Sequence, residues 1–184
     1  DVYKRQMKGG CLLVTRISFT GVFAAIAVCL TAGLSGCSKG EEKPEELDKS
    51  FTCNAVIIQE DTTYRAQLER VDGAGWKAVF SEPETIKGME LSLLNDQCTV
   101  NFKELTYTAE REELPQNGMI SLVASAADRC ISGKGVKSSS KGDSFILDGE
   151  INGVSFTAKV KNSTVSSLEI GGEITAELSD YDVK

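Results

Sequence analysis

Residues 145–160 read FILDGEINGVSFTAKV, and this stretch decides the fold. The Asn152-Gly153 dipeptide at its centre is the preferred pair for a two-residue type I′ hairpin turn. Folding the chain shut at that turn pairs Phe145 with Val160, Leu147 with Ala158, Gly149 with Phe156 and Ile151 with Val154. Because these positions share one face and polar residues fill the other, the stretch predicts a half-buried β-hairpin of defined register.

Two more turns give the same kind of signal. Folding at Asn95-Asp96 pairs Leu93 with Cys98, Leu91 with Val100 and Met89 with Phe102. At Gly171-Gly172, a two-residue loop would set an apolar residue against a glutamate. A three-residue loop over 171–173 instead pairs Ile170 with Ile174 and Leu168 with Ala176. We therefore expect the longer loop there, with a glycine in the left-handed conformation.

The N-terminal half continues the alternation of apolar and polar residues. Residues 51–59 and 63–71 flank Asp61-Thr62 and read as two strands joined by a turn. Residues 76–80 read as a third strand, which ends at Pro83.

One segment has helical spacing instead, from Gly118 to about Ile131. Its apolar stripe consists of Met119, Leu122, Val123, Ala126, Ala127 and Cys130. Asn117 is the candidate N-cap, and Gly133 is the candidate stop. The Gly-, Ser- and Lys-rich residues 133–143 are expected to form a mobile loop.

Strands, one helix and further strands predict an α+β domain, with a curved antiparallel sheet, a half-barrel, covered by one main helix. Such an arrangement leaves room for an apolar ligand between sheet and helix. The candidate lining residues are Trp76, Phe80, Met89, Leu91, Val100, Phe102, Met119, Leu122, Val123, Phe145 and Phe156. The competing interpretation is that these side chains simply fill the core.

The N-terminus has the pattern of a bacterial lipoprotein signal. Residues 1–6 precede the first methionine and are interpreted as a sequencing-adaptor scar. Residues 7–36 combine a basic start, an uncharged apolar run and Leu34-Ser35-Gly36 before Cys37. Leu-Ser-Gly-Cys matches the lipobox, so Cys37 is predicted to carry diacylglycerol. The alternatives are an uncleaved membrane anchor and an ordinary cleaved signal.

Residues 37–50 then form the lipidated cysteine and a charged tether, and residues 51–184 form the domain. The expected location is the outer face of the cytoplasmic membrane, in the bacterial cell envelope, with the lipid on Cys37 as the anchor.

Composition excludes several function classes. From Cys37 onward, 26 acidic residues outnumber 16 basic ones, which argues against a nucleic-acid partner and disfavours a polybasic membrane-binding face. The chain contains no histidine, which removes Ser-His-Asp and Cys-His catalysis. Its acidic clusters lie in polar runs, and Gly133-Lys134-Gly135 lacks P-loop spacing. We therefore expect no enzyme activity, no cofactor and no metal site.

Three cysteines remain in the expected domain: Cys53, Cys98 and Cys130. Each lies at an apolar position of its strand or helix, which indicates a small buried hydrophobic residue. One disulfide among them is the alternative to three buried thiols.

Several scattered positions resemble lipoproteins of clostridia and related Firmicutes with the LolA-like fold. The matching positions are Phe51-Thr52, Tyr64, Leu68, Trp76, Phe80, Pro83, Ile86, Gly88-Met89, Phe102-Lys103-Glu104-Leu105, Leu114-Pro115 and residues 149–156. That fold group includes lipoprotein carriers, LppX-type lipoproteins and RseB-type stress sensors. The resemblance carries over no catalytic residue, and it implies that the concave side of the sheet grips an apolar ligand or a protein.

Two functions follow as expectations. The first is a membrane-anchored, non-catalytic module that binds a lipid or another apolar ligand. The second is a protein-interaction or sensor module of the envelope, active in RseB-like regulation or in envelope or spore assembly.

Overall fold

The computed structural model describes residues 46–113 and 118–184, and the described chain forms one antiparallel sheet crossed by one α-helix. The strands are β1 (Phe51–Gln59), β2 (Thr62–Val71), β3 (Gly75–Glu82), β4 (Glu90–Leu94), β5 (Gln97–Phe102), β6 (Leu105–Glu110), β7 (Lys137–Lys141), β8 (Ser144–Ile151), β9 (Val154–Lys161), β10 (Thr164–Ile170) and β11 (Ile174–Val183). The helix is α1 (Met119–Ser132), and two short 3₁₀ turns are η1 (Glu84–Ile86) and η2 (Arg111–Glu113).

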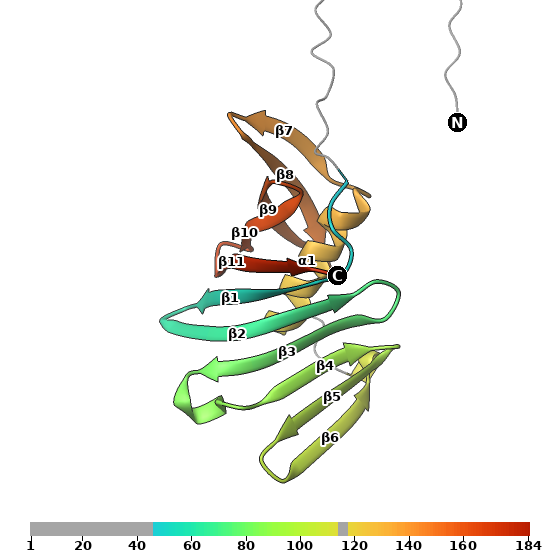
Figure 1. Cartoon of the computed structure of the whole chain (residues 1–184), viewed down its shortest axis with the longest axis vertical. Coiled ribbons are helices and arrows are strands. Elements are labelled where there is room, and N and C mark those ends of the chain that lie inside the picture. The colour runs from blue at the N-terminus through green and yellow to red at the C-terminus, as the bar shows by residue number, and fades with distance from the viewer. Residues whose placement is uncertain (1–45, 114–117) are drawn as a thin grey trace, which may run out of the picture. The chain divides into compact units, whose positions relative to one another are not determined.

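The sheet has 11 strands in the order β6-β5-β4-β3-β2-β1-β11-β10-β9-β8-β7 (Figure 1). The first and last strands pair at its centre. From β1 the consecutive strands are added outward to β6 at one edge. The chain then crosses through α1 to β7 at the other edge, and the remaining strands are added inward to β11. The sheet is open, with β6 and β7 as its edges, so the expected α+β architecture of an antiparallel sheet with one helix is confirmed.

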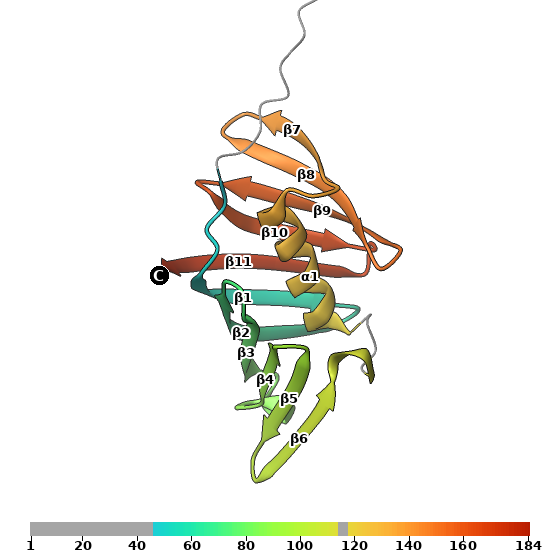
Figure 2. The same ribbon diagram turned by 90° about the vertical axis from the view of Figure 1, so that its right-hand side faces the viewer.

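The helix packs on one face of the sheet, against β8, β9 and β10 (Figure 2). Its buried residues include Leu122, Val123, Ala126 and Cys130, which belong to the predicted apolar stripe. An ion pair between Arg70 Nε on β2 and Asp128 Oδ1, at 2.8 Å, holds the helix to the other half of the sheet. Among the described residues, no helix is long and apolar enough to span a membrane.

The helix ends where the sequence indicates. Gly133 adopts the left-handed conformation, with φ at 64°, and its N–H bonds to the carbonyls of Arg129 and Cys130. At the other end Gly118 occupies the N-cap position and supplies no side-chain hydrogen bond. The predicted N-cap, Asn117, lies outside the described residues.

The three predicted hairpin registers are present. All four pairs around Asn152-Gly153 are confirmed, as are Ile170 with Ile174 and Leu168 with Ala176. Leu93 with Cys98 and Leu91 with Val100 are also confirmed. Met89 and Phe102 are not a ladder pair, because β4 begins at Glu90, which pairs with Asn101.

Two expectations about turns and loops are wrong. The first turn is Glu60-Asp61, because Thr62 already pairs with Gln59 in the ladder. The expected mobile loop contains strand β7, which pairs with β8 from Lys137 to Lys141. Its sequence, KSSSK, lacks apolar alternation because an edge strand can be held by backbone hydrogen bonds alone.

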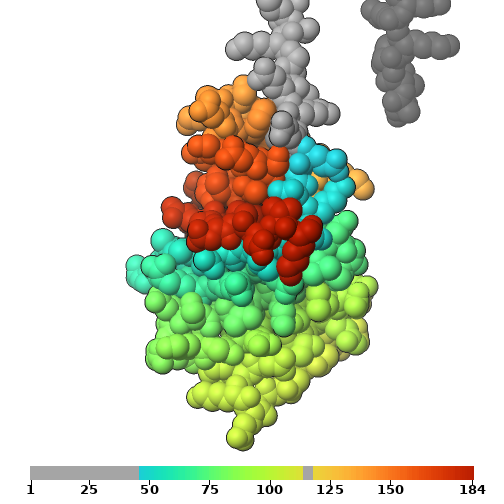
Figure 3. All heavy atoms as spheres, viewed as in Figure 1, coloured from blue at the N-terminus to red at the C-terminus, as the bar shows by residue number. Residues whose placement is uncertain are grey.

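The end of the expected tether is packed against the domain. Leu47 is 4% exposed and belongs to the core cluster. The Asp48 N–H donates to the carbonyl of Ser163 at 3.3 Å, and the Lys184 N–H donates to the carbonyl of Ser50 at 3.0 Å. Figure 3 shows residues 46–50 in cyan beside the end of β11 in red. We call residues 46–50 the entry segment.

Candidate functional site

A single row of side chains crosses five strands on the helix-facing side of the sheet. Leu68, Ala78, Leu91, Val100 and Tyr107 are successive partners from β2 to β6. The exposed fraction is 2% at Leu68 and 61% at Tyr107. The row therefore runs from the core into solvent without becoming polar.

Neighbouring positions extend this surface, which we call the open apolar face. It comprises Met89, Leu91, Val100, Phe102, Leu105 and Tyr107. The first four are half-buried, whereas Leu105 is 74% exposed. The face is open because α1 packs on β8–β10, while β4–β6 extend past the helix (Figure 2).

The structure divides the predicted ligand-lining residues into two groups. Trp76, Phe80, Leu122, Val123 and Phe156 are buried members of the core. The other six are half-buried, and all of them except Phe102 pack against that core: Met89, Leu91, Val100, Phe102, Met119 and Phe145. Four of these six belong to the open apolar face: Met89 directly precedes β4, Leu91 lies on β4, and Val100 and Phe102 lie on β5. Met119 begins α1, and Phe145 lies on β8.

Leu105 and Tyr107 were missed by the sequence reasoning. The signal was present, because Leu105, Tyr107 and Ala109 alternate with polar residues as a half-buried strand does. Their hairpin turns at Lys103-Glu104, with Phe102 paired to Leu105. This turn lacks the glycine or asparagine that marked the three hairpins of predicted register, which is why β6 was not predicted.

Trp76 places an unpaired hydrogen-bond donor within the described core. Its ring meets the Phe51 ring edge-on, with centroids 5.7 Å apart. The indole Nε1 is buried and has no hydrogen-bond partner in the described part of the chain. A buried donor without a partner costs about 1–3 kcal/mol, so the packing of the ring has to offset that loss.

The two sheet edges differ in character. β6 has a sheet partner on one side only, β5, and carries Leu105 and Tyr107 on the open apolar face. β7, at the other edge, carries Lys137 and Lys141 with serines between them. Edge lysines discourage pairing with another chain, so β7 is protected in a way that β6 is not.

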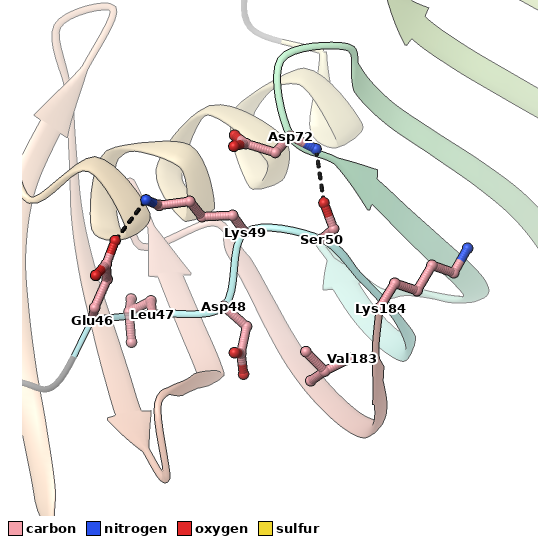
Figure 4. Close-up of a pocket in the computed structure, with 8 residues that line it drawn as sticks. All are labelled: Glu46, Leu47, Asp48, Lys49, Ser50, Asp72, Val183 and Lys184. Carbon is pink, nitrogen blue, oxygen red and sulfur yellow. Dashed lines mark hydrogen bonds and ion pairs between the residues drawn. The ribbon is translucent and has the colours of Figure 1, made fainter.

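A polar pocket of about 370 Å³ lies at the entry segment, between it, Asp72 and the end of β11 (Figure 4). Lys49 pairs with Glu46, and the Asp72 N–H donates to Ser50 Oγ at 3.0 Å. The Arg70 guanidinium also donates to the Lys49 carbonyl. These contacts hold the entry segment against the domain. The polar groups that form them are therefore already paired with one another.

A shallow groove of about 490 Å³ lies on the face of the sheet opposite the helix. Its polar side chains also pair internally: Asn54 Nδ2 donates to Asp180 Oδ2 at 3.0 Å, and Arg65 pairs with Glu82 at 2.9 Å. In both pockets polar side chains pair with neighbours of the same chain. We therefore do not assign the main site to either pocket.

The cysteines of the domain are chemically quiet. Cys53, Cys98 and Cys130 are buried free thiols. Burial raises the pKa of Cys53 and of Cys130 to about 12, and it also raises the pKa of Cys98. Since the thiolate is the reactive form, these positions suit packing rather than nucleophilic chemistry. Near Cys53 and Cys130, the Tyr181 hydroxyl donates to the Val165 carbonyl at 2.6 Å.

Cys37 and the rest of the predicted signal and tether up to residue 45 lie outside the described residues. Lipidation at Cys37 therefore stays a prediction from sequence.

No protein-family model and no curated protein matches this sequence. Among solved structures, the chain is similar to a LolA superfamily protein, NE2245 from Nitrosomonas europaea, with 12% identity and a TM-score of 0.43 over 78% of this chain and 89% of that one. It is also similar to PNGF-II, with 7% identity and a TM-score of 0.32 over 74% of this chain and 28% of the other. At these values neither likeness carries functional information to this chain.

Proposed function

We propose that this protein is a lipid-anchored module of the bacterial cell envelope that binds the hydrocarbon part of a lipid, or another apolar ligand, at the open apolar face. The observation that supports it is the row from Leu68 to Tyr107, which stays apolar from the core to solvent. A contiguous exposed apolar surface marks an interaction site more often than chance exposure does.

Burial energetics favour an occupant for this face. Covering apolar surface contributes roughly 25 cal/mol per Å². Leu105 and Tyr107 have the most exposed surface that a ligand could bury, and the four half-buried residues supply the rest of the buried area. A ligand with acyl chains lying along β4–β6 would cover all six side chains without disturbing the buried core.

The chemistry of the face is that of binding rather than catalysis. Its side chains are methionine, leucine, valine and phenylalanine, with the Tyr107 phenol as its one polar group. General acid–base catalysis requires a titratable group with a pKa near the working pH. We therefore infer a non-catalytic role.

The anchor places this module beside a source of lipid. Cys37 ends the predicted signal, and residues 38–45 separate it from the entry segment. Diacylglycerol on Cys37 would hold the domain at the outer face of the cytoplasmic membrane.

Photo-crosslinking tests the ligand site. Cells expressing the full chain are fed a fatty acid carrying a diazirine, irradiated, and the adducts are mapped by mass spectrometry. We expect adducts on peptides from β4–β6. The double variant Leu105→Glu/Tyr107→Glu should reduce the adduct yield about tenfold or more, which corresponds to about 1.4 kcal/mol.

Ile58→Glu is the matched control, because Ile58 is 45% exposed and occupies an alternate, outward-facing position of β1. Equal loss of adduct in the control, or adducts scattered over the domain, would contradict an apolar site at β4–β6.

Cys37→Ser tests the anchor separately. We expect the wild-type chain to incorporate labelled palmitate and to sediment with membranes, and the variant to do neither. A wild-type chain that stays unlabelled would remove the membrane anchor and leave the apolar site to be judged by the crosslinking alone.

The second candidate function, a protein-interaction or sensor module, is favoured by the unprotected edge at β6. An extended partner segment can add to such an edge through backbone hydrogen bonds, with alternate side chains on the open apolar face. A photoreactive residue at Thr106 should then crosslink to a protein of defined mass, whereas one at Ser139 in β7 should not. Lipid adducts alone at Thr106 would favour the first function.

A further inference from the structure

Four lysines gather on one face of the strands near the β7 edge. Ser139 on β7 pairs with Ile146 on β8, which pairs with Lys159 on β9. These residues therefore share a face, and two-residue alternation adds Lys137, Lys141 and Lys161 to it. We call these four exposed lysines the lysine face.

The lysine face consists of cationic side chains without an ion-pair partner among the described residues, a property that it shares with Lys103 and Lys134. Within the described ranges, lysine–carboxylate ion pairs involve Lys49, Lys77, Lys87 and Lys184. The lysine face takes part in none of them. Asp148 pairs across from Lys137 in the ladder and accepts a hydrogen bond from Thr157 at 2.7 Å. Glu150 and Glu169 lie on the same face of the sheet, and neither forms a described ion pair with these lysines.

Edge protection explains only half of this surface. Lys137 and Lys141 lie on the edge strand β7, where lysine discourages aggregation. Lys159 and Lys161 lie on β9, which is paired on both sides by β8 and β10. Edge protection therefore does not apply to the β9 lysines, which occupy the solvent-facing positions of an interior strand.

The entry segment docks next to this surface. The Asp48 N–H bonds to the carbonyl of Ser163, two residues after Lys161, and Leu47 is buried in the core. Residue 37 precedes Glu46 by nine positions, which span at most about 32 Å when fully extended. A chain anchored at Cys37 would therefore keep the end of β9 close to the membrane.

We propose that the lysine face rests on the anionic headgroups of the membrane to which the chain is tethered. This inference rests on the anchor in the proposed function. The remaining described residues include 23 acidic and 10 basic side chains. An anionic membrane surface therefore repels the rest of the domain on average. Each lysine close to such a surface strengthens binding about fivefold.

The orientation has a consequence for the open apolar face. β7 and β6 are opposite edges of the sheet, ten strand spacings apart, each of about 4.8 Å. The lysine face lies on the side of the sheet opposite α1, because Lys159 and Lys161 alternate with the buried Ala158 and Val160, whereas the open apolar face lies on the helix-facing side. Contact of the lysine face with headgroups therefore leaves the open apolar face uncovered, so that another molecule can reach it.

Lysine labelling on vesicles tests this orientation. The lipidated full chain is reconstituted into vesicles of phosphatidylcholine, with or without phosphatidylglycerol, and exposed amines are acetylated and quantified by mass spectrometry. We expect labelling of Lys141 and Lys159 to fall about fivefold or more on the anionic vesicles. Lys103, in the β5–β6 turn, is the internal control and should label equally on both.

The variant Lys159→Gln/Lys161→Gln should return Lys141 to its labelling on neutral vesicles, whereas Lys103→Gln should not. Equal labelling of the lysine face on both vesicles, or protection that persists in high salt, would overturn the proposed orientation while leaving the anchor intact. A chain that fails to stay on either vesicle would overturn the anchor and this orientation together.

Discussion

Cys53, Cys130 and Tyr181 show how burial alone sets the chemistry of single residues. Desolvation raises the pKa of all three, and that of both thiols reaches about 12. The Tyr181 hydroxyl is nevertheless satisfied, because it donates to the Val165 carbonyl. The helix and the two central strands thus meet over groups that are neutral at physiological pH.

Stability should fall in alkali because of these thiols. An unfolded thiol ionises near its ordinary pKa of 9.0, whereas the folded thiols stay protonated up to about 12. Between these values the unfolded state binds fewer protons, so the free energy of unfolding decreases by about 1.4 kcal/mol per pH unit for each thiol.

Urea unfolding, followed by the fluorescence of Trp76, measures this slope. Between pH 9 and pH 11, the free energy of unfolding of Cys53→Ala/Cys130→Ala should decrease less steeply with pH than that of the wild type. Parallel slopes would show that the thiols do not carry the effect. Tyr181 should leave a residual slope in both, because its pKa is also raised.

Gly149 is required by a close approach rather than by its backbone angle. A Cβ at this position would lie 2.7 Å from the Phe156 ring and 3.2 Å from Val136 Cγ1. We expect Gly149→Ala to destabilise the fold by about 1–3 kcal/mol through overpacking. In a Phe156→Leu background the same substitution should cost less, and a double-mutant cycle without coupling would contradict this explanation.

At the scale of elements, the entry segment belongs to the domain. Leu47→Ala should lower the free energy of unfolding by about 2–3 kcal/mol, because it removes a buried side chain next to the core. Glu46→Gln is the control, since its ion pair with Lys49 is exposed. Equal unfolding midpoints for Leu47→Ala and wild type would return residues 46–50 to the tether.

The two edge strands show why elements differ in how well sequence predicts them. β7 has no apolar alternation, and β6 has alternation but a turn without glycine or asparagine. Both are stabilised by pairing with a neighbour that lies next to them only after the chain has folded. Local pattern therefore identifies interior strands more readily than edges.

At the scale of the molecule, the sheet is unevenly covered. The half containing β8–β10 packs against α1, while β4–β6 present the open apolar face to solvent. We expect β4–β6 to open below the global free energy of unfolding, because they bury less apolar surface.

Native-state hydrogen exchange measures this difference. Amides in β4 and β5 should exchange faster than those in β9 and β10, although all four strands are paired on both sides. A ligand on the open apolar face should slow β4 and β5 selectively. Equal protection across the sheet would contradict the uneven coverage as the cause.

Charge is organised on the same scale. The acidic excess of the whole chain disfavours a polybasic membrane-binding surface, yet four lysines share one face near β7. Net charge is a sum over the whole sequence and does not say where the charges lie. Only the register of β7–β9 reveals that these four lysines lie together.

The sequence by itself determined the elements whose signals are local. Turn dipeptides and apolar alternation specified the 152–153 and 171–173 hairpins and most of the 95–96 hairpin, and helical spacing with Gly133 specified α1. The lipobox at Cys37 is also local, and it remains a prediction. Backbone geometry and side-chain period act over a few residues, so these features can be read before folding.

Only the tertiary structure decided which of the predicted apolar residues are core and which form a surface. Trp76 and Phe80 are buried, whereas Leu91, Val100 and Phe102 stay partly exposed beside Leu105 and Tyr107. All of them have the same alternation along their strands. Their exposure depends on where α1 crosses the sheet, and that position results from packing between segments far apart in the chain.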